Sequence, residues 1–118
     1  MVKPKRYIPN AGDIVWLSFN PQAGREQSGR SPALVVSPKA YNRKTDLALF
    51  CPITNQEKGY PFEVKIPDGL KIGGVVLSDQ IRSLDWKIRN AEFICKLPEK
   101  EFSETLDKLN VLINHAED

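Results

Sequence analysis

The stretch GREQSGRSPALVVS, residues 24–37, changes from a charged, glycine-punctuated segment to an apolar one. Its first half belongs to a polar loop, residues 20–32, and loops of this length are often functional. Its second half, residues 33–37, is a short apolar run that predicts a buried strand. Because the charged side chains of the loop are unsuited to burial in the core, we expect them to contact a binding partner.

Short strands separated by turn residues account for most of the remaining chain. Residues 61–66 and 91–97 alternate between apolar and polar side chains. Apolar, β-branched runs predict further strands at residues 13–19, 46–53 and 74–77. Strands this short and closely spaced favour a small curled barrel over an open sheet.

The terminal segment has a different period. Apolar side chains recur at three- and four-residue steps between Phe102 and Ile113, which predicts an amphipathic helix that begins near Pro98. Residues 38–45 read as a basic connection between strands. We therefore expect a mainly β fold, a small barrel of about five to seven strands with a C-terminal α-helix.

Length and composition bound the class of protein. A chain of 118 residues fits a single domain, residues 1–118, with the composition of an ordinary globular protein. It has no apolar run approaching the roughly 20 residues that span a bilayer, and no secretory signal is recognisable. The expected location is the cytoplasm.

The sequence contains no recognisable metal-binding motif. Cys51 and Cys95 lie in strand-like runs, so we expect buried thiols. No CxxC motif occurs and the one histidine is His115, so neither a Cys/His metal site nor a cofactor is expected.

The net charge of +2 hides an uneven distribution. Residues 1–96 carry 15 of the 17 basic side chains and 9 of the 15 acidic ones, whereas residues 97–118 carry 2 basic and 6 acidic ones. A basic body suits an anionic partner, although an uneven solvated surface explains the charges equally well.

Several runs follow one another in a fixed order: GDIVWLSFNPQAGREQSG, SPALVVSP, YNRKT, PIT, KGYPFEV and GVVLSDQIRSLDW. Together with the terminal helix they resemble the MazF/PemK family of toxins, from about Tyr7 to Ile113. The resemblance implies a homodimer of SH3-like β-barrels that cuts single-stranded RNA, chiefly mRNA, at specific sequences without metal or ribosome. It also implies an antitoxin whose acidic, flexible tail occupies the RNA groove.

Cleavage of RNA by its own 2′-hydroxyl needs a base, groups that stabilise the added negative charge, and help for the leaving 5′ oxygen. With a single histidine in the chain, this work must fall to carboxylate, guanidinium and hydroxyl groups. The resemblance implies that Glu26 is the general base, or that it orients an arginine. It implies that Gln27 hydrogen-bonds to the edge of an RNA base or holds the loop in place. It implies that the Thr54 hydroxyl donates a hydrogen bond to the phosphate. Without the resemblance, Glu26 is an ordinary surface acid and Thr54 an ordinary strand-end threonine.

A second cluster lies in SDQIRSLDW, residues 78–86. The resemblance implies catalysis or RNA contact for Asp79. Gln80 can donate and accept hydrogen bonds, and the planar fork of Arg82 suits phosphate. The alternative is that Asp79 and Arg82 simply pair with each other.

Other residues suit contacts with an RNA chain. Lys58, Asn42 and Arg43 are the expected contacts to its backbone, which would set affinity and salt sensitivity. Tyr60 and Trp86 are candidates to stack on unpaired bases, although aromatic residues in so small a domain more often belong to the core or to a subunit interface.

The chain departs from the family pattern E-Q-x-G-x-R-P, whose arginine is the candidate for transition-state stabilisation and proton transfer. Here Ser31 occupies that place and Arg30 comes one residue early. If the segment is extended, Arg30 points away from the phosphate, and if it is a loop, Arg30 can swing in. Two explanations stay open: the arginine is repositioned at Arg30, or the chain carries an inactivating Arg→Ser change at position 31. We keep both residues among the catalytic candidates and expect Ser31 to weaken the enzyme.

Two other functions stay open. One is a non-catalytic RNA-binding module, for which Ser31 is the best argument. The other is a toxin that poisons gyrase with the same barrel, although the terminal residues INHAED do not resemble that group.

Overall fold

The computed structural model describes residues 6–18 and 29–114. Its elements in chain order are β1 (Asp13–Ser18), β2 (Arg30–Val35), α1 (Lys39–Thr45), β3 (Leu47–Thr54), β4 (Glu63–Lys65), β5 (Val75–Leu77), the short 3₁₀ helix η2 (Ser78–Gln80), β6 (Arg82–Asp85), β7 (Glu92–Lys96) and α2 (Glu99–Ile113).

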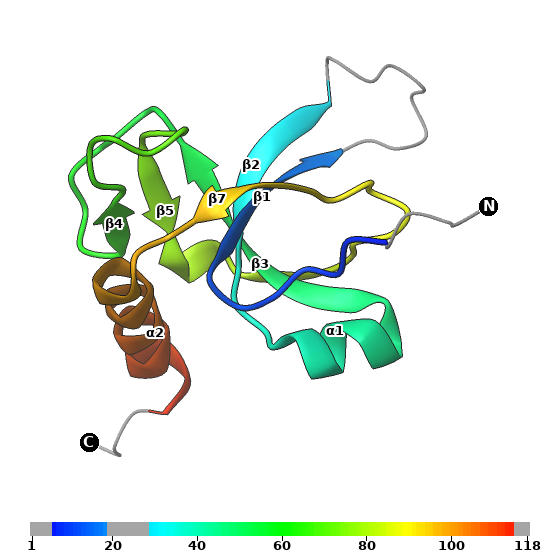
Figure 1. The fold of residues 1–118 in the computed structure, drawn as a ribbon. Helices are drawn as coiled ribbons and strands as arrows, with labels where there is room; N and C mark the ends of the chain where they lie inside the picture. The colour runs from blue at the N-terminus through cyan, green and yellow to red at the C-terminus, as the bar shows by residue number, and fades with distance from the viewer. Residues whose placement is uncertain (1–5, 19–28, 115–118) are drawn as a thin grey trace.

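The strands form one curled antiparallel sheet in the order β4-β5-β3-β2-β1-β7, and β6 pairs with β3 outside this path. Figure 1 shows α2 beside β4 and β5, and α1 at the opposite end of β3. The expected mainly β architecture with a C-terminal helix is confirmed. Within the described residues no strand ladder joins β4 to β7.

Alternating side chains divide the core between the two faces of the sheet, because successive residues of a strand point to opposite sides. Ile14 of β1, Leu34 of β2 and Cys51 of β3 lie in register on the first face, which is covered by α2. Leu17, Ala33 and Phe50, together with Trp86, belong to the core on the second face. No helix in the described part of the chain is long and apolar enough to cross a bilayer.

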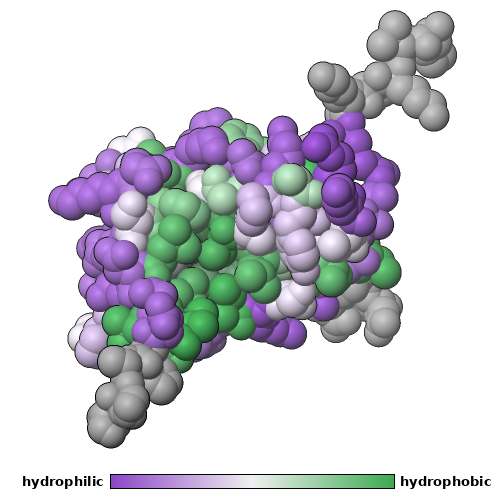
Figure 2. All heavy atoms as spheres, turned by 90° about the horizontal axis from the view of Figure 1, so that it is seen from below, coloured by the Kyte–Doolittle hydropathy of each residue, from purple (hydrophilic) through white to green (hydrophobic). Residues whose placement is uncertain are grey.

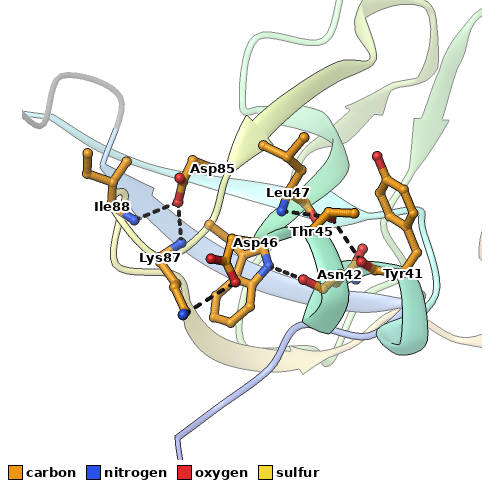
Figure 3. Close-up of polar contacts among 9 residues, drawn as sticks. Tyr41, Asn42, Thr45, Asp46, Leu47, Asp85, Lys87 and Ile88 are labelled. Carbon is orange, nitrogen blue, oxygen red and sulfur yellow. Dashed lines mark hydrogen bonds and ion pairs between the residues drawn. The ribbon is translucent and has the colours of Figure 1, made fainter.

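Helix α1 corrects the expectation of a basic connection over residues 38–45. The helix has 7 residues, too few for an apolar period to show in the sequence. It ends at Asp46, whose φ of 62° is left-handed and whose amide donates to the Asn42 carbonyl at 3.0 Å. Lys87 pairs with the Asp46 carboxylate at 3.3 Å and thereby ties this end of α1 to the turn after β6 (Figure 3).

Strand β2 begins at Arg30, three residues earlier than the expected strand over residues 33–37. Cross-strand pairing explains the difference, because Arg30 lies opposite Ser18 and Ser31 lies opposite Leu17 in the ladder with β1. Strand β6 was also missed, since its exposed residues Arg82 and Ser83 give no apolar run. Pairing with a neighbouring strand therefore decides the structure of both segments: β1 for the start of β2, and β3 for β6.

Candidate functional site

Thr54 ends β3 and is half-buried beside a hollow of about 130 Å³. Its Oγ1 accepts a hydrogen bond from the amide of Gln56 at 3.1 Å. A hydroxyl has one hydrogen to donate besides its acceptor sites, so Thr54 keeps a donor for a ligand. The hollow is lined by Thr54, Gln56, Lys58, Tyr60, Glu63, Leu77 and Gln80.

The Glu63 carboxylate fixes the loop that carries Lys58. It accepts hydrogen bonds from the amides of Lys58 at 2.9 Å and of Gly59 at 2.8 Å. Gly59 has a φ of +86°, a conformation that costs little only for glycine. Glu63 was not among the predicted site residues, because it lies on the polar side of an alternating strand and was interpreted as an ordinary solvent-exposed acid.

Tyr60 and Asp79 are joined by a hydrogen bond of 3.0 Å from the phenol to the carboxylate. Partial burial, followed by this hydrogen bond and the negative charge of Asp79, raises the pKa of the Tyr60 phenol above its ordinary value. Among the ion pairs of the described residues none joins Asp79 to Arg82, and the simple pairing of these two residues is therefore not observed.

A second hollow of about 150 Å³ adjoins the first, because Gln80 lines both. Its other lining residues are Leu17, Ala33, Phe50, Pro52, Arg82 and Leu84. Arg82 is exposed at the start of β6, so its guanidinium is available to an anion at the edge of an otherwise apolar hollow. We call the rim formed by Thr54, Lys58, Gln80 and Arg82 the Thr54–Arg82 surface.

Ser31 lies on the same side of the sheet as this surface. It is half-buried and pairs with Leu17, which lines the second hollow. The ladder between β2 and β3 runs from Val35–Phe50 to Ala33–Pro52. Ser31 lies two residues before Ala33 in β2, so its side chain points to the same face of the sheet as Ala33, which lines the second hollow.

Arg30 lies on the opposite face. Its guanidinium pairs with Glu92 at 2.7 Å and stands 5.3 Å from the centre of the Trp16 ring. It lines a different hollow, together with Ser18, Arg89, Asn90, Ala91 and Glu92. Since the segment is extended here, adjacent side chains diverge, and Arg30 does not join the Thr54–Arg82 surface.

Asn42 corrects the expectation of a contact with an RNA backbone, because its side chain is fully buried. Its Nδ2 donates to the carbonyls of Pro9 at 2.8 Å and Ser37 at 3.0 Å, and its Oδ1 accepts from the Ser37 hydroxyl at 2.6 Å. Trp86 is buried as well and donates its Nε1–H to the Asn42 carbonyl at 2.9 Å, so it belongs to the core rather than to a stacking surface.

Arg43 is exposed on α1 but lies far from Thr54. Helix α1 ends just before β3 begins, and Thr54 is the last residue of β3. At about 3.3 Å per residue, β3 extends about 23 Å from Leu47 to Thr54. Figure 1 shows α1 at the opposite end of β3 from β4 and β5.

Glu26 and Gln27, both predicted at the site, lie outside the described residues. In the part of the chain that the structure does describe, no group of three or more His, Cys, Asp and Glu side chains is placed to hold a metal ion. Of the predicted site residues, four line the two adjoining hollows: Thr54, Lys58, Gln80 and Arg82.

Comparisons with known proteins show what the whole chain is similar to. The family model described as "PemK-like, MazF-like toxin of type II toxin-antitoxin system" matches residues 10–113. The endoribonuclease toxin MazF of Escherichia coli K12 is 44% identical over 108 residues, which cover 92% of this chain and 96% of that protein. A crystal structure of MazF from Deinococcus radiodurans superposes with a TM-score of 0.82 at 53% identity, over 92% of this chain and 98% of that one. A crystal structure of MazE–MazF from the same organism superposes with a TM-score of 0.85 at 46% identity, over 94% of this chain and 100% of that one.

Proposed function

The chain belongs to the PemK-like, MazF-like family of toxins of type II toxin–antitoxin systems, and on this premise we propose that it cuts single-stranded RNA at specific sequences, without a metal ion or the ribosome. The observation that carries the proposal is the Thr54–Arg82 surface, where a free hydroxyl donor and two cationic side chains surround adjoining hollows.

The groups on this surface suit a phosphate that gains negative charge as the 2′ oxygen attacks it. The Thr54 hydroxyl donates to a phosphate oxygen, and the Arg82 guanidinium can hold two oxygens at once. Lys58 adds a third source of positive charge near the hollow. Donors held in place before the reaction stabilise developing charge without the cost of reorganisation.

The proton steps need further groups from the loop before β2. We assign the removal of the 2′ proton to Glu26, or to an arginine that Glu26 orients, and contact with a base edge to Gln27. Asp79 holds the Tyr60 phenol at the rim, and Gln80 lies between the two hollows, where it can hydrogen-bond to a base. Arg43 is proposed only as a contact with RNA beyond the reacting phosphate.

Ser31 is proposed to weaken this chemistry. It occupies the place of the family's arginine and lies on the face of the Thr54–Arg82 surface, whereas Arg30 is held on the other face by Glu92 and Trp16. A serine offers one uncharged donor where a guanidinium offers five and a positive charge. The expected consequence is slow cleavage rather than a different reaction.

The proposed partners are a second copy of the chain and an acidic antitoxin segment that competes with RNA. Helix α2 leaves Leu106, Val111, Leu112 and Ile113 exposed, and Figure 2 shows a contiguous apolar area on one face of the molecule. Apolar areas of this kind commonly mark interfaces. The solved MazE–MazF structure supports an antitoxin partner, and the basic side chains of the site suit an acidic one.

The decisive experiment incubates the purified protein with single-stranded RNA in the presence of a chelator. We expect cleavage at defined positions, and a loss of about 10² in rate for Thr54→Ala. The matched control is Ser103→Ala, which removes an exposed hydroxyl on α2 whose partner is Glu99 at 3.3 Å. Intact RNA after incubation with both the wild-type chain and Ser31→Arg overturns the proposal. Protection of RNA without cleavage then favours a binding module, and inhibition of gyrase favours the gyrase-poisoning class.

A further inference from the structure

A hollow of about 360 Å³ lies at the end of β1 that is remote from Ser31. Asp13 begins β1 and lines this hollow, whereas Leu17, four residues later, lines the hollow beside Arg82. The lining residues are Arg6, Tyr7, Ile8, Asn10, Asp13, Lys39, Phe93 and Lys96. We call it the Phe93 hollow, and no step of the proposed reaction uses it.

The one acidic residue that lines the Phe93 hollow is fully engaged with its neighbours. Asp13 is 4% exposed. Its Oδ2 accepts hydrogen bonds from the Tyr7 phenol at 2.5 Å and from the backbone amide of Asn10 at 3.0 Å. Its Oδ1 pairs with Lys96 at 3.0 Å. The carboxylate is therefore neutralised inside the protein and does not repel an anion at the surface.

The remaining charges of the hollow are positive and uncompensated. Within residues 6–18 and 29–114, neither the Arg6 guanidinium nor the Lys39 ammonium takes part in an ion pair. Lys39 is held in place through its backbone, which donates to Asn10 Oδ1 at 3.0 Å and leaves the ammonium free. Two unpaired cations on one hollow favour a ligand with negative charge.

An aromatic ring completes the hollow. Phe93 is 50% exposed on the edge strand β7, and its ring packs at a tilt against Tyr7 with 5.9 Å between the ring centres. A fixed phenyl ring beside free cations is the combination that binds single-stranded nucleic acid, in which a base stacks while the phosphate meets the charge. An acidic peptide would use the cations and leave the ring without a partner.

We propose that the Phe93 hollow binds a nucleotide of single-stranded RNA outside the cleaved stretch, with its phosphate at Arg6 and Lys39 and its base on Phe93. The proposal rests on the proposed ribonuclease function and adds a second contact surface to it. The hollow offers no free carboxylate among its lining residues, so it holds RNA and does not cut it. Its contribution is to the affinity for long substrates.

The test compares a short RNA, which covers only the cleaved stretch, with a long RNA that extends beyond it on both sides. Binding is measured by fluorescence anisotropy in a Thr54→Ala background, and cleavage is measured with the wild-type site. We expect Phe93→Ala to weaken binding of the long RNA about tenfold and to leave the short RNA unaffected. We expect Lys39→Ala and Arg6→Ala each to reduce the slope of log affinity against log salt by about 0.7. The matched controls are Ile88→Ala and Lys71→Ala, which remove an exposed apolar side chain and an exposed basic side chain elsewhere on the molecule. Neither control should change the affinity for the short or the long RNA.

The outcomes separate this inference from the function on which it rests. If the wild type cuts the short RNA, and the long RNA binds equally well to the Thr54→Ala protein with and without each of the three substitutions, the second surface is excluded while the ribonuclease stands. If a polyglutamate peptide binds through Lys39 and Arg6 while long RNA is unaffected, the hollow belongs to an acidic protein and the proposal is wrong. If no RNA is cut or bound at all, both proposals fail together.

Discussion

Arg30 and Ser31 are neighbours in β2 and point to opposite faces of the sheet. Arg30 reaches Glu92 and the ring of Trp16, whereas Ser31 pairs with Leu17 on the side of the Thr54–Arg82 surface. A strand alternates with a period of two, so a shift of one residue moves a guanidinium from one face to the other. The position of one arginine therefore decides whether the face that carries Lys58 and Arg82 also carries a third cationic side chain.

Replacing Ser31 with arginine should restore a donor to the site. We expect Ser31→Arg to accelerate RNA cleavage by about 10²–10³, because one transition-state donor is commonly worth that much. The measurement is a time course on one RNA with a chelator present. Arg30→Ala is the control, and its rate should stay close to that of the wild type. Equal rates for the wild type and Ser31→Arg would contradict the weakening role of Ser31, and loss of cleavage in Arg30→Ala would show that Arg30 acts in the reaction.

Glu63 should act on cleavage through Lys58. We expect Glu63→Ala to lower the free energy of unfolding by about 1 kcal/mol, since two hydrogen bonds at an exposed loop are lost, and to raise the KM for RNA. The control is Glu57→Ala, whose carboxylate in the same loop lies 3.6 Å from the exposed Lys65 and should matter little.

A double-mutant cycle separates positioning from general destabilisation. If Glu63 acts by holding Lys58, the effect of Glu63→Ala on KM should vanish in a Lys58→Ala background. An effect of the same size in both backgrounds would contradict the positioning role.

Asn42 should matter for stability. Truncation to alanine leaves the carbonyl of Pro9 and the hydroxyl of Ser37 without their buried partner. We expect a loss of about 2–4 kcal/mol in the free energy of unfolding, measured by urea denaturation, and only about 0.5 kcal/mol for the exposed neighbour Arg43→Ala. A small effect at Asn42 would mean that water replaces the lost amide.

Cys51 should make the protein less stable at high pH. Burial, followed by the charge of Asp79, raises the pKa of its thiol from 9.0 to about 12. The unfolded chain therefore loses this proton first, so the stabilising contribution is complete below pH 9 and falls as pH rises toward 12. We expect a loss of about 1.4 kcal/mol between pH 8 and pH 10, measured as the change in the free energy of unfolding.

This decline should be absent in Cys51→Ala, whatever the stability of that variant at neutral pH. Cys95→Ala, which removes a half-buried thiol from β7, is the matched control and should retain it. Tyr7 also has a raised pKa, through burial and its contact with Asp13, but its contribution begins only above pH 10. An unchanged decline in Cys51→Ala would assign the effect to another group.

The sequence was most informative where the pattern of side chains is local. Strands β1, β3, β4, β5 and β7 and helix α2 were all predicted, because alternation and helical spacing record which side of each segment is buried. It failed at α1 and β6, which are short, carry few buried residues, and contact β3.

The sequence alone determined the mainly β fold, the terminal helix and the residue types suited to RNA. The tertiary structure decided which of them meet: it gathered Thr54, Lys58, Gln80 and Arg82, buried Asn42 and turned Arg30 toward Glu92. The reason is that spacing along the chain fixes only the face of one element. The partners across that face depend on the register between strands, which contacts distant in sequence establish.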